Sequence, residues 1–171
     1  MVVIGAGAAG LVSSYIAAVV KAKVTLVEKH KMGGDCLNYG CVPSKALIKT
    51  ATLVQQMRHS QRYGIAEAQL TVNFADVMER VAGVVRDIEP HDSVERYTGL
   101  GVEVLQGQAK IIDPWHVQVS LADGSVQALS TRCIVIATGA EPFVPPLPGL
   151  DAVGYVTSDT LWGLRERPAR L

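Results

Sequence analysis

The sequence lacks any apolar run near the roughly 20 residues that a membrane-spanning helix needs. Its apolar N-terminal stretch carries glycines and has no basic leader, which is not the pattern of a signal peptide. The 16 basic and 16 acidic residues leave a formal net charge of zero, so no general electrostatic attraction to nucleic acid or acidic membrane is expected. Internal repeats, coiled-coil registers and low-complexity segments are also missing. These absences predict a cytoplasmic protein that binds neither nucleic acid nor membrane.

Cysteine is scarce as well, because the 171 residues include only three. Three cysteines in a reducing compartment are too few for a framework of structural disulfides. Two of them, Cys36 and Cys41, are close in sequence, and a close pair of this kind is more typical of redox chemistry or metal binding. The length and the 49% hydrophobic content predict a globular chain with one substantial core.

The N-terminal residues have the pattern of a strand, a glycine-rich turn, a helix and a second strand. The apolar run 1–4 leads into a GxGxxG motif, and residues 23–27 form another apolar run that ends at Glu28. We expect Gly5 to make the tight turn, Gly7 to let a pyrophosphate approach the backbone, and Gly10 to let the helix pack on the strand. The free N–H groups at the helix N-terminus favour phosphate. Glu28 can accept hydrogen bonds from ribose hydroxyls, so the unit predicts dinucleotide binding.

The cysteine pair has several interpretations from residue chemistry alone. Two buried cysteines on one core helix are an alternative, because residues five apart in an ideal helix lie too far apart for a disulfide. Asn38 and Gly40 lie between the cysteines, however, and both favour a bend that could bring the sulfurs together. Pro43 fits the first turn of a helix that follows the bend. This pattern favours a redox pair over a structural one.

Lys45 and Ser44 bear on the remaining alternatives. A helix N-terminus and a nearby lysine favour the thiolate form of a cysteine, and Lys45 follows Cys41 by four residues, although a solvated surface lysine is the other interpretation. Zinc would need about four ligands, and only two cysteines are close. A plant-type iron–sulfur cluster would need a cysteine where Ser44 stands. We therefore expect no metal site.

Residues 33–45, Gly-Gly-Asp-Cys-Leu-Asn-Tyr-Gly-Cys-Val-Pro-Ser-Lys, closely resemble the active-site signature of the class I flavoprotein disulfide reductases. That family includes glutathione reductase, dihydrolipoamide dehydrogenase and mercuric reductase, and the Val-Pro-Ser-Lys ending is most similar to the last two. The resemblance covers essentially the whole chain. It implies that Cys36 is the interchange thiol, that Cys41 lies against the isoalloxazine as the charge-transfer thiolate, and that Lys45 lies near flavin N5. Asp35 departs from the threonine common in the family, and a carboxylate there repels phosphate unless it points away, is protonated or is bridged.

The rest of the chain alternates between helix and strand patterns. We expect helices over 44–62, ending at Gly64 with His59 and Arg62 solvated, over 74–88 with Asn73 as its cap, and over 91–97 with a surface His91. Strand patterns follow over 102–105, 116–121 and 126–129, with Asp123-Gly124 as a hairpin turn. This meander resembles the one inserted in the family's flavin domain, which implies that Ala109 contacts the adenine. Residues 133–136 read as a buried strand in which Cys133 is a packed core thiol. The Ala137-Thr138-Gly139 segment after it matches the family's second flavin fingerprint.

The resemblance completes the prediction of fold and site. The expected fold is α/β, a Rossmann-like FAD-binding domain with a parallel sheet and an inserted antiparallel β-meander. Residues 1–150 form this domain, and residues 151–171 form a connector towards an NAD(P)H-binding domain that the chain does not contain. The implied catalytic residues are Cys36, Cys41 and Lys45. The implied cofactor-binding residues are Gly5, Gly7, Ala8, Ala9, Gly10, Glu28, Lys29, Gly34, Asp35, Lys45, Ala109, Thr138 and Gly139.

The function implied is that of an N-terminal fragment of an FAD-dependent oxidoreductase. In the parent, NAD(P)H would reduce FAD, and electrons would pass through Cys36 and Cys41 to a small-molecule or protein disulfide, a lipoyl group or a metal ion. The parent is expected to be a homodimer, and the fragment alone to be incomplete as an enzyme. Two alternatives remain open: a non-catalytic flavin- or nucleotide-binding module, and a thiol-redox protein that works without flavin.

Overall fold

The computed structural model describes residues 1–66 and 69–170, and it divides into two compact units. The sheet unit comprises Met1–Asn38 and Ile88–Glu141, and the helical unit comprises Tyr39–Asp87 and Pro142–Leu171. Leu171, the last residue of the predicted connector, lies outside the described residues. Each unit is described by itself below.

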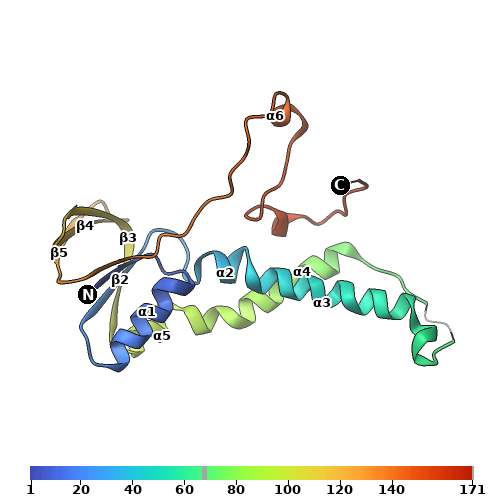
Figure 1. Ribbon diagram of the computed structural model, residues 1–171, viewed down its shortest axis with the longest axis horizontal. Coiled ribbons are helices and arrows are strands. Elements are labelled where there is room, and N and C mark those ends of the chain that lie inside the picture. Colours follow the sequence, from blue (N-terminus) through green and yellow to red (C-terminus); the bar gives the residue numbers. More distant parts are fainter. Residues whose placement is uncertain (67–68, 171) are drawn as a thin grey trace. The chain divides into compact units, whose positions relative to one another are not determined.

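The sheet unit is built on six strands in the order β5-β4-β3-β2-β1-β6. Figure 1 labels β2 to β5. β1 pairs in parallel with β2 and with β6, and β2 pairs in parallel with β3. β3, β4 and β5 then form an antiparallel meander, and a four-residue turn containing Gly124 at φ +83° joins the last two. The strands are β1 (Val2–Ile4), β2 (Val24–Glu28), β3 (Val102–Asp113), β4 (His116–Leu121), β5 (Val126–Ser130) and β6 (Ile134–Ile136). This mixed sheet with its meander confirms the predicted fold class.

Alternating side chains of the central strands form two apolar clusters on opposite faces of the sheet. Val3 and Leu26 pack with Leu11 and Tyr97 in one cluster. On the other face, the neighbouring valines of β1 and β2 pack with Val117 and Val119 of the meander. All residues of β2 are buried, since strands and helices cover it on every side. Fully burying one such side chain contributes about 1.5–3 kcal/mol, so these two clusters hold the unit together.

Helices complete the sheet unit, and the most important is α1, which connects β1 to β2. α5 packs against β3, and a short 3-10 helix precedes it. The sequence predicts one helix over 91–97, but Ser93 interrupts it, because its hydroxyl accepts a hydrogen bond from the backbone N–H of Arg96 and starts a new helix. The helices are α1 (Ala8–Val19), α2 (Gly34–Asn38), η2 (Glu89–Asp92) and α5 (Val94–Gly99).

The helical unit contains two long helices, α3 and α4, which run side by side (Figure 1). The Arg80 guanidinium of α4 donates to the carbonyl of Ala46 in α3 at 3.1 Å. Asn73 caps α4 as predicted, since its side chain accepts from the N–H of Ala75 at 3.1 Å. The elements of this unit are α3 (Cys41–Arg58), η1 (Ser60–Tyr63), α4 (Phe74–Ile88), α6 (Leu150–Val153) and η3 (Leu161–Gly163).

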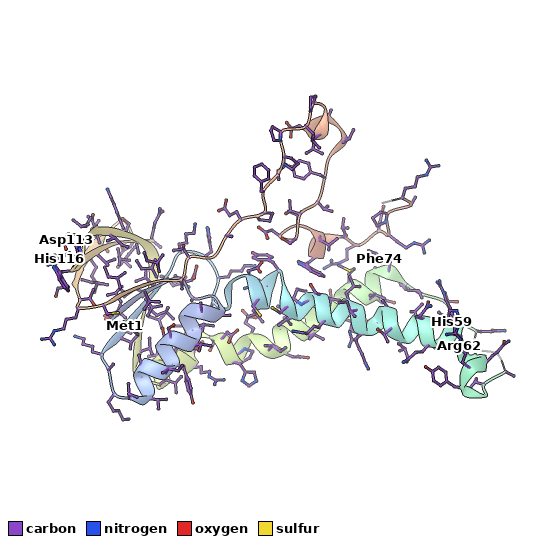
Figure 2. All side chains as sticks on the ribbon, in the orientation of Figure 1. Met1, His59, Arg62, Phe74, Asp113 and His116 are labelled. Carbon is purple, nitrogen blue, oxygen red and sulfur yellow. The ribbon has the colours of Figure 1, made fainter. Side chains whose placement is uncertain are left out.

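The predicted helix over 44–62 is wrong in its boundaries. α3 begins three residues earlier, at Cys41, and ends at Arg58, after which a separate 3-10 helix runs to Tyr63. Gly64 ends that turn in the left-handed conformation, as expected of a glycine stop. His59 and Arg62 are exposed near this end, which confirms their prediction as solvated positions (Figure 2). Among the described residues, no helix has both the length and the apolar content needed to cross a membrane.

The prediction of a buried final strand with a packed Cys133 is also wrong. β6 pairs with β1 and lies at the edge of the sheet formed by the described residues, and its three residues are only partly buried or exposed. Cys133 precedes β6 and is exposed. An apolar sequence predicts a strand, but the strand order decides whether both faces and both edges are covered.

Candidate functional site

In the glycine turn after β1, close packing against backbone atoms requires glycine at two of the three positions, Gly5 and Gly10. Gly5 has φ +102°, and a Cβ atom on it would overlap the carbonyl oxygen of Ala137. A Cβ on Gly10 would overlap the carbonyl oxygen of Gly5. A Cβ on Gly10 would also lie 3.4 Å from the Val3 side chain of β1, so the predicted close packing of α1 on the strand is present. Neither glycine position tolerates a side chain without backbone movement.

The backbone around Gly7 is less crowded than that around Gly5 and Gly10. The nearest atom to a Cβ built on Gly7 is the Cα of Gly34, at 3.8 Å. The contact is tighter on the side of Gly34, because a Cβ built on Gly34 would lie only 2.5 Å from the Cα of Gly7. The first residue of α2 is thus packed against the glycine turn, and this contact brings two segments of the predicted cofactor site together.

The N-terminus of α1 is free to face an anion. Gly7 is its N-cap and supplies no side-chain cap, and the first turn contains no acidic residue. Ala8 and Ala9 are exposed, so small side chains leave the first N–H groups accessible. The aligned peptides of a helix place about half a positive charge at such an end. This arrangement suits a phosphate group.

Glu28, the last residue of β2, is buried, with 8% of its surface exposed. Its Oε2 atom accepts a hydrogen bond from the N–H of Ala6 at 2.6 Å, and its Oε1 atom accepts from the N–H of His30 at 2.7 Å. The carboxylate therefore fixes the glycine turn to the end of β2. An ionised carboxylate has about four acceptor positions, so two remain for hydroxyl groups of a ligand.

The segment after β6 joins the same region. The N–H of Ala137 donates to the carbonyl of Ile4 at 2.8 Å, and the Cα of Thr138 lies 3.2 Å from a Cβ built on Gly5. Thr138 and Gly139 are exposed. The segments that follow β1, β2 and β6, together with Gly34, thus gather at the carboxyl ends of parallel strands, a region we call the carboxyl edge. Ligands of open α/β sheets bind at this edge.

Four predicted cofactor residues lie outside the contacts just described: Lys29, Asp35, Ala109 and Lys45, of which Lys45 is described with the cysteines below. Lys29 is exposed directly after Glu28, and Asp35 is exposed on α2. Ala109 lies in the antiparallel part of β3, opposite Val119, and packs on the second apolar cluster. Within the part of the chain that the structure describes, no group of three or more histidine, cysteine or acidic residues could hold a metal ion.

The cysteines lie on different helices, so the alternative of one continuous core helix is wrong. Half-buried Cys36 belongs to α2, and exposed Cys41 is the first residue of α3. The predicted bend is present. Asn38 is the last residue of α2, and its side-chain amide donates to the carbonyls of Met32 and Gly34. Gly40 is the N-cap of α3. The boundary between the two compact units falls inside this bend, between Asn38 and Tyr39.

Lys45 is exposed one turn after Cys41 in α3, and Pro43 lies in the first turn of that helix, as predicted. The sequence did not predict one polar contact in the segment between the cysteines. The indole N–H of Trp162 donates to the carbonyl of Tyr39 at 2.7 Å. The two residues are separated by 123 positions, and no local pattern connects them.

The sequence pattern of the family described as "Pyridine nucleotide-disulphide oxidoreductase" matches residues 1–171. A dihydrolipoyl dehydrogenase of Geobacillus stearothermophilus is 41% identical over 145 residues, which cover 84% of this chain and 30% of that protein. A mercuric reductase of Staphylococcus aureus is 30% identical over 171 residues, covering 100% of this chain and 30% of that protein. The chain therefore spans about 30% of the length of these curated relatives.

A solved structure shares the fold. The crystal structure of LpdA from Mycobacterium tuberculosis superposes with a TM-score of 0.82 at 24% sequence identity, covering 96% of this chain and 37% of that one. At this identity the likeness concerns the fold alone. It agrees with the sheet order and the meander described above.

Proposed function

Because the chain belongs to the pyridine nucleotide-disulphide oxidoreductase family, we propose that it forms the FAD-binding part of a flavoprotein oxidoreductase. The observation that carries this proposal is the meeting of the glycine turn, Glu28 and Gly34 at the carboxyl edge. That edge offers an uncapped helix N-terminus for a pyrophosphate and a buried carboxylate for ribose hydroxyls. These groups fit the adenosine diphosphate half of FAD.

We assign the pyrophosphate to the α1 N-terminus and the ribose to Glu28, with exposed Lys29 available to the same part of the ligand. Ala109 is assigned to the adenine by resemblance to the family. Asp35 is exposed, so its carboxylate keeps its hydration and need not contact phosphate directly. The remaining assignments are Gly5, Gly7, Ala8, Ala9, Gly10, Gly34, Lys45, Thr138 and Gly139.

The cysteine pair is assigned the redox step. When bound, FAD would carry two electrons from NAD(P)H to a disulfide between Cys36 and Cys41. Breaking that S–S bond takes up two electrons and two protons and gives two thiols. Cys36 then reacts with the substrate. By resemblance to the family, Cys41 is the thiolate next to the flavin ring, and Lys45 lies near flavin N5. The separate helices and the intervening bend support this division of roles.

The substrate class follows from the relatives. Dihydrolipoyl dehydrogenase and mercuric reductase are the names of proteins that match 84% and 100% of this chain, respectively. We propose that the full-length protein is an NAD(P)H-dependent homodimer that reduces a disulfide, a lipoyl group or a metal ion. Since the chain spans about 30% of those relatives, efficient turnover requires more protein than these residues.

Reductive titration of the purified chain with FAD tests the proposal. We expect near-stoichiometric flavin binding and uptake of four electrons, two by the flavin and two by the disulfide. The C36S/C41S variant should bind flavin and take up two electrons. Cys133→Ser, which changes an exposed thiol outside the pair, should still take up four. Absence of flavin binding would refute the cofactor assignment, and uptake of only two electrons by the wild-type chain would refute the redox pair.

Two other functions remain as outcomes of the same titration. Flavin binding without extra electrons supports a non-catalytic flavin-binding module. Disulfide reduction without flavin binding supports a thiol-redox protein. Oxidation of NAD(P)H by the chain alone would show that it is complete as an enzyme.

A further inference from the structure

The carbonyl group of Tyr39 is held from a distant part of the chain. The Nε1–H of Trp162, in η3, donates to this oxygen at 2.7 Å. Tyr39 follows Cys36 by three residues and precedes Cys41 by two. Trp162 and Tyr39 are half-buried and belong to the same compact unit. The contact therefore acts on the middle of the segment that joins the two cysteines.

The Tyr39 carbonyl lies outside the hydrogen bonds of α3. Gly40 is the N-cap of that helix, and the N–H of Ser44 donates to the Gly40 carbonyl at 3.1 Å. Because Tyr39 precedes the N-cap, α3 supplies no donor to its carbonyl. A part-buried carbonyl without a partner is unfavourable. The indole of Trp162 supplies that partner from a distant part of the chain.

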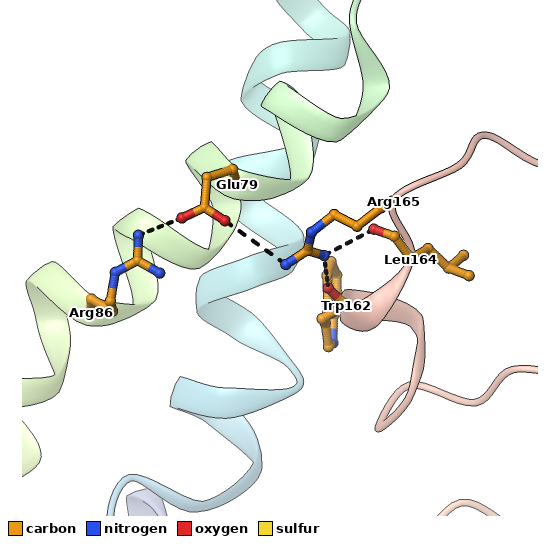
Figure 3. Close-up of polar contacts among 5 residues, drawn as sticks. All are labelled: Glu79, Arg86, Trp162, Leu164 and Arg165. Atoms are coloured by element: carbon orange, nitrogen blue, oxygen red, sulfur yellow. Dashed lines mark hydrogen bonds and ion pairs between the residues drawn. The ribbon is translucent and has the colours of Figure 1, made fainter.

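A network around Arg165 holds the segment that carries Trp162 (Figure 3). Its Nη1 atom donates to the carbonyls of Trp162 and Leu164, both at 3.0 Å, and its Nη2 atom lies 3.9 Å from Oε2 of Glu79 on α4. The other oxygen of Glu79 pairs with Arg86 at 2.7 Å, and this hydrogen-bonded guanidinium lowers the pKa of the Glu79 carboxyl. Exposed ion pairs contribute little, so the indole bond is the specific contact.

We propose that Trp162 is a positioning residue for the cysteine pair. Its N–H holds the Tyr39 carbonyl, which belongs to the backbone between Cys36 and Cys41. The dithiol–disulfide equilibrium of the pair depends on the conformation of this backbone. A disulfide requires a restricted separation of the two Cα atoms, so the equilibrium is sensitive to that backbone. This inference rests on the redox role proposed above for the pair.

The test compares Trp162→Phe with Trp115→Phe in a Cys133→Ser background. Phenylalanine keeps an aromatic ring and removes the donor, while Trp115 is the other tryptophan and is 58% exposed near the β3–β4 turn. Each chain is equilibrated with reduced and oxidised dithiothreitol. When the cysteine pair forms its S–S bond, the oxidised form accepts the two electrons and two protons and becomes the reduced form. The thiols are trapped by alkylation and counted by mass spectrometry.

We expect Trp162→Phe to change the equilibrium constant about fivefold, equivalent to about 20 mV, since one hydrogen bond is lost. Trp115→Phe should match the wild type. An unchanged equilibrium in Trp162→Phe would overturn the inference while leaving the redox pair intact. A wild-type chain that forms no disulfide overturns both.

Discussion

The Oε2 atom of Glu28 lies 2.6 Å from the backbone nitrogen of Ala6 and accepts its hydrogen bond. The same carboxylate also accepts from the N–H of His30. Glu28 therefore has a structural role besides the ribose contact proposed for it, because it joins the end of β2 to the glycine turn. A change at this position is expected to affect both stability and ligand affinity.

Replacing Glu28 with glutamine should destabilise the chain and weaken FAD binding. An amide has one acceptor oxygen where the carboxylate has two, so the N–H of Ala6 or that of His30 loses its partner. We expect a loss of about 1–3 kcal/mol in the free energy of unfolding, measured by urea denaturation. Glu141→Gln, at an exposed position, is the control and should unfold like the wild type. Equal stability of the two variants would contradict the structural role of Glu28.

Replacing Gly10 with alanine should lower stability and flavin affinity together. The added Cβ meets the carbonyl oxygen of Gly5, and a backbone atom cannot move aside as a flexible side chain can. We expect a cost of about 1–3 kcal/mol, as for other overpacked sites. The matched control is Gly99→Ala in α5, where a Cβ has nothing within 4 Å. If both variants unfolded at the same denaturant concentration, the close contact at Gly10 would be refuted.

Replacing Ser14 with alanine should stabilise the chain. Ser14 is fully buried on α1, and among the described residues its hydroxyl has no hydrogen-bond partner. Burial of such a group is unfavourable, and alanine is also the better helix former. We expect a gain of about 1 kcal/mol in thermal or urea unfolding. A loss of stability would reveal a partner for this hydroxyl.

Replacing Tyr97 with phenylalanine should protect the fold at alkaline pH. Burial raises the pKa of the Tyr97 phenol above its ordinary value of 10.0, and the nearby Asp92 carboxylate adds to this effect. The unfolded chain therefore releases the phenolic proton first, so unfolding free energy that is present below pH 10 is lost as the pH rises through 10.0. Above about pH 10, the wild type should lose more unfolding free energy than the variant. Tyr63→Phe, at a residue 66% exposed, should behave like the wild type.

Local patterns were sufficient for several features. The apolar runs and the GxGxxG spacing predict the β1–α1–β2 unit, with Glu28 at its end, because both depend on neighbouring residues. Asn73 as a helix cap and the bend between the cysteines also follow from intrinsic conformational preferences. Cys133 shows where such reasoning fails. Its apolar surroundings suggested a core position, but β6 pairs with β1 at an edge of the sheet.

The sequence by itself determined the family, through residues 33–45, and the types of residue available for a dinucleotide and a redox pair. Only the tertiary structure decided which of them meet. Gly34 packs on Gly7, Glu28 binds the turn at Ala6, and Trp162 holds the Tyr39 carbonyl between the cysteines. Helical and strand periodicities report on residues a few positions apart. Contacts between segments tens of residues apart arise only when folding buries their surfaces together, and unsatisfied backbone groups then take whichever donors the packing brings near.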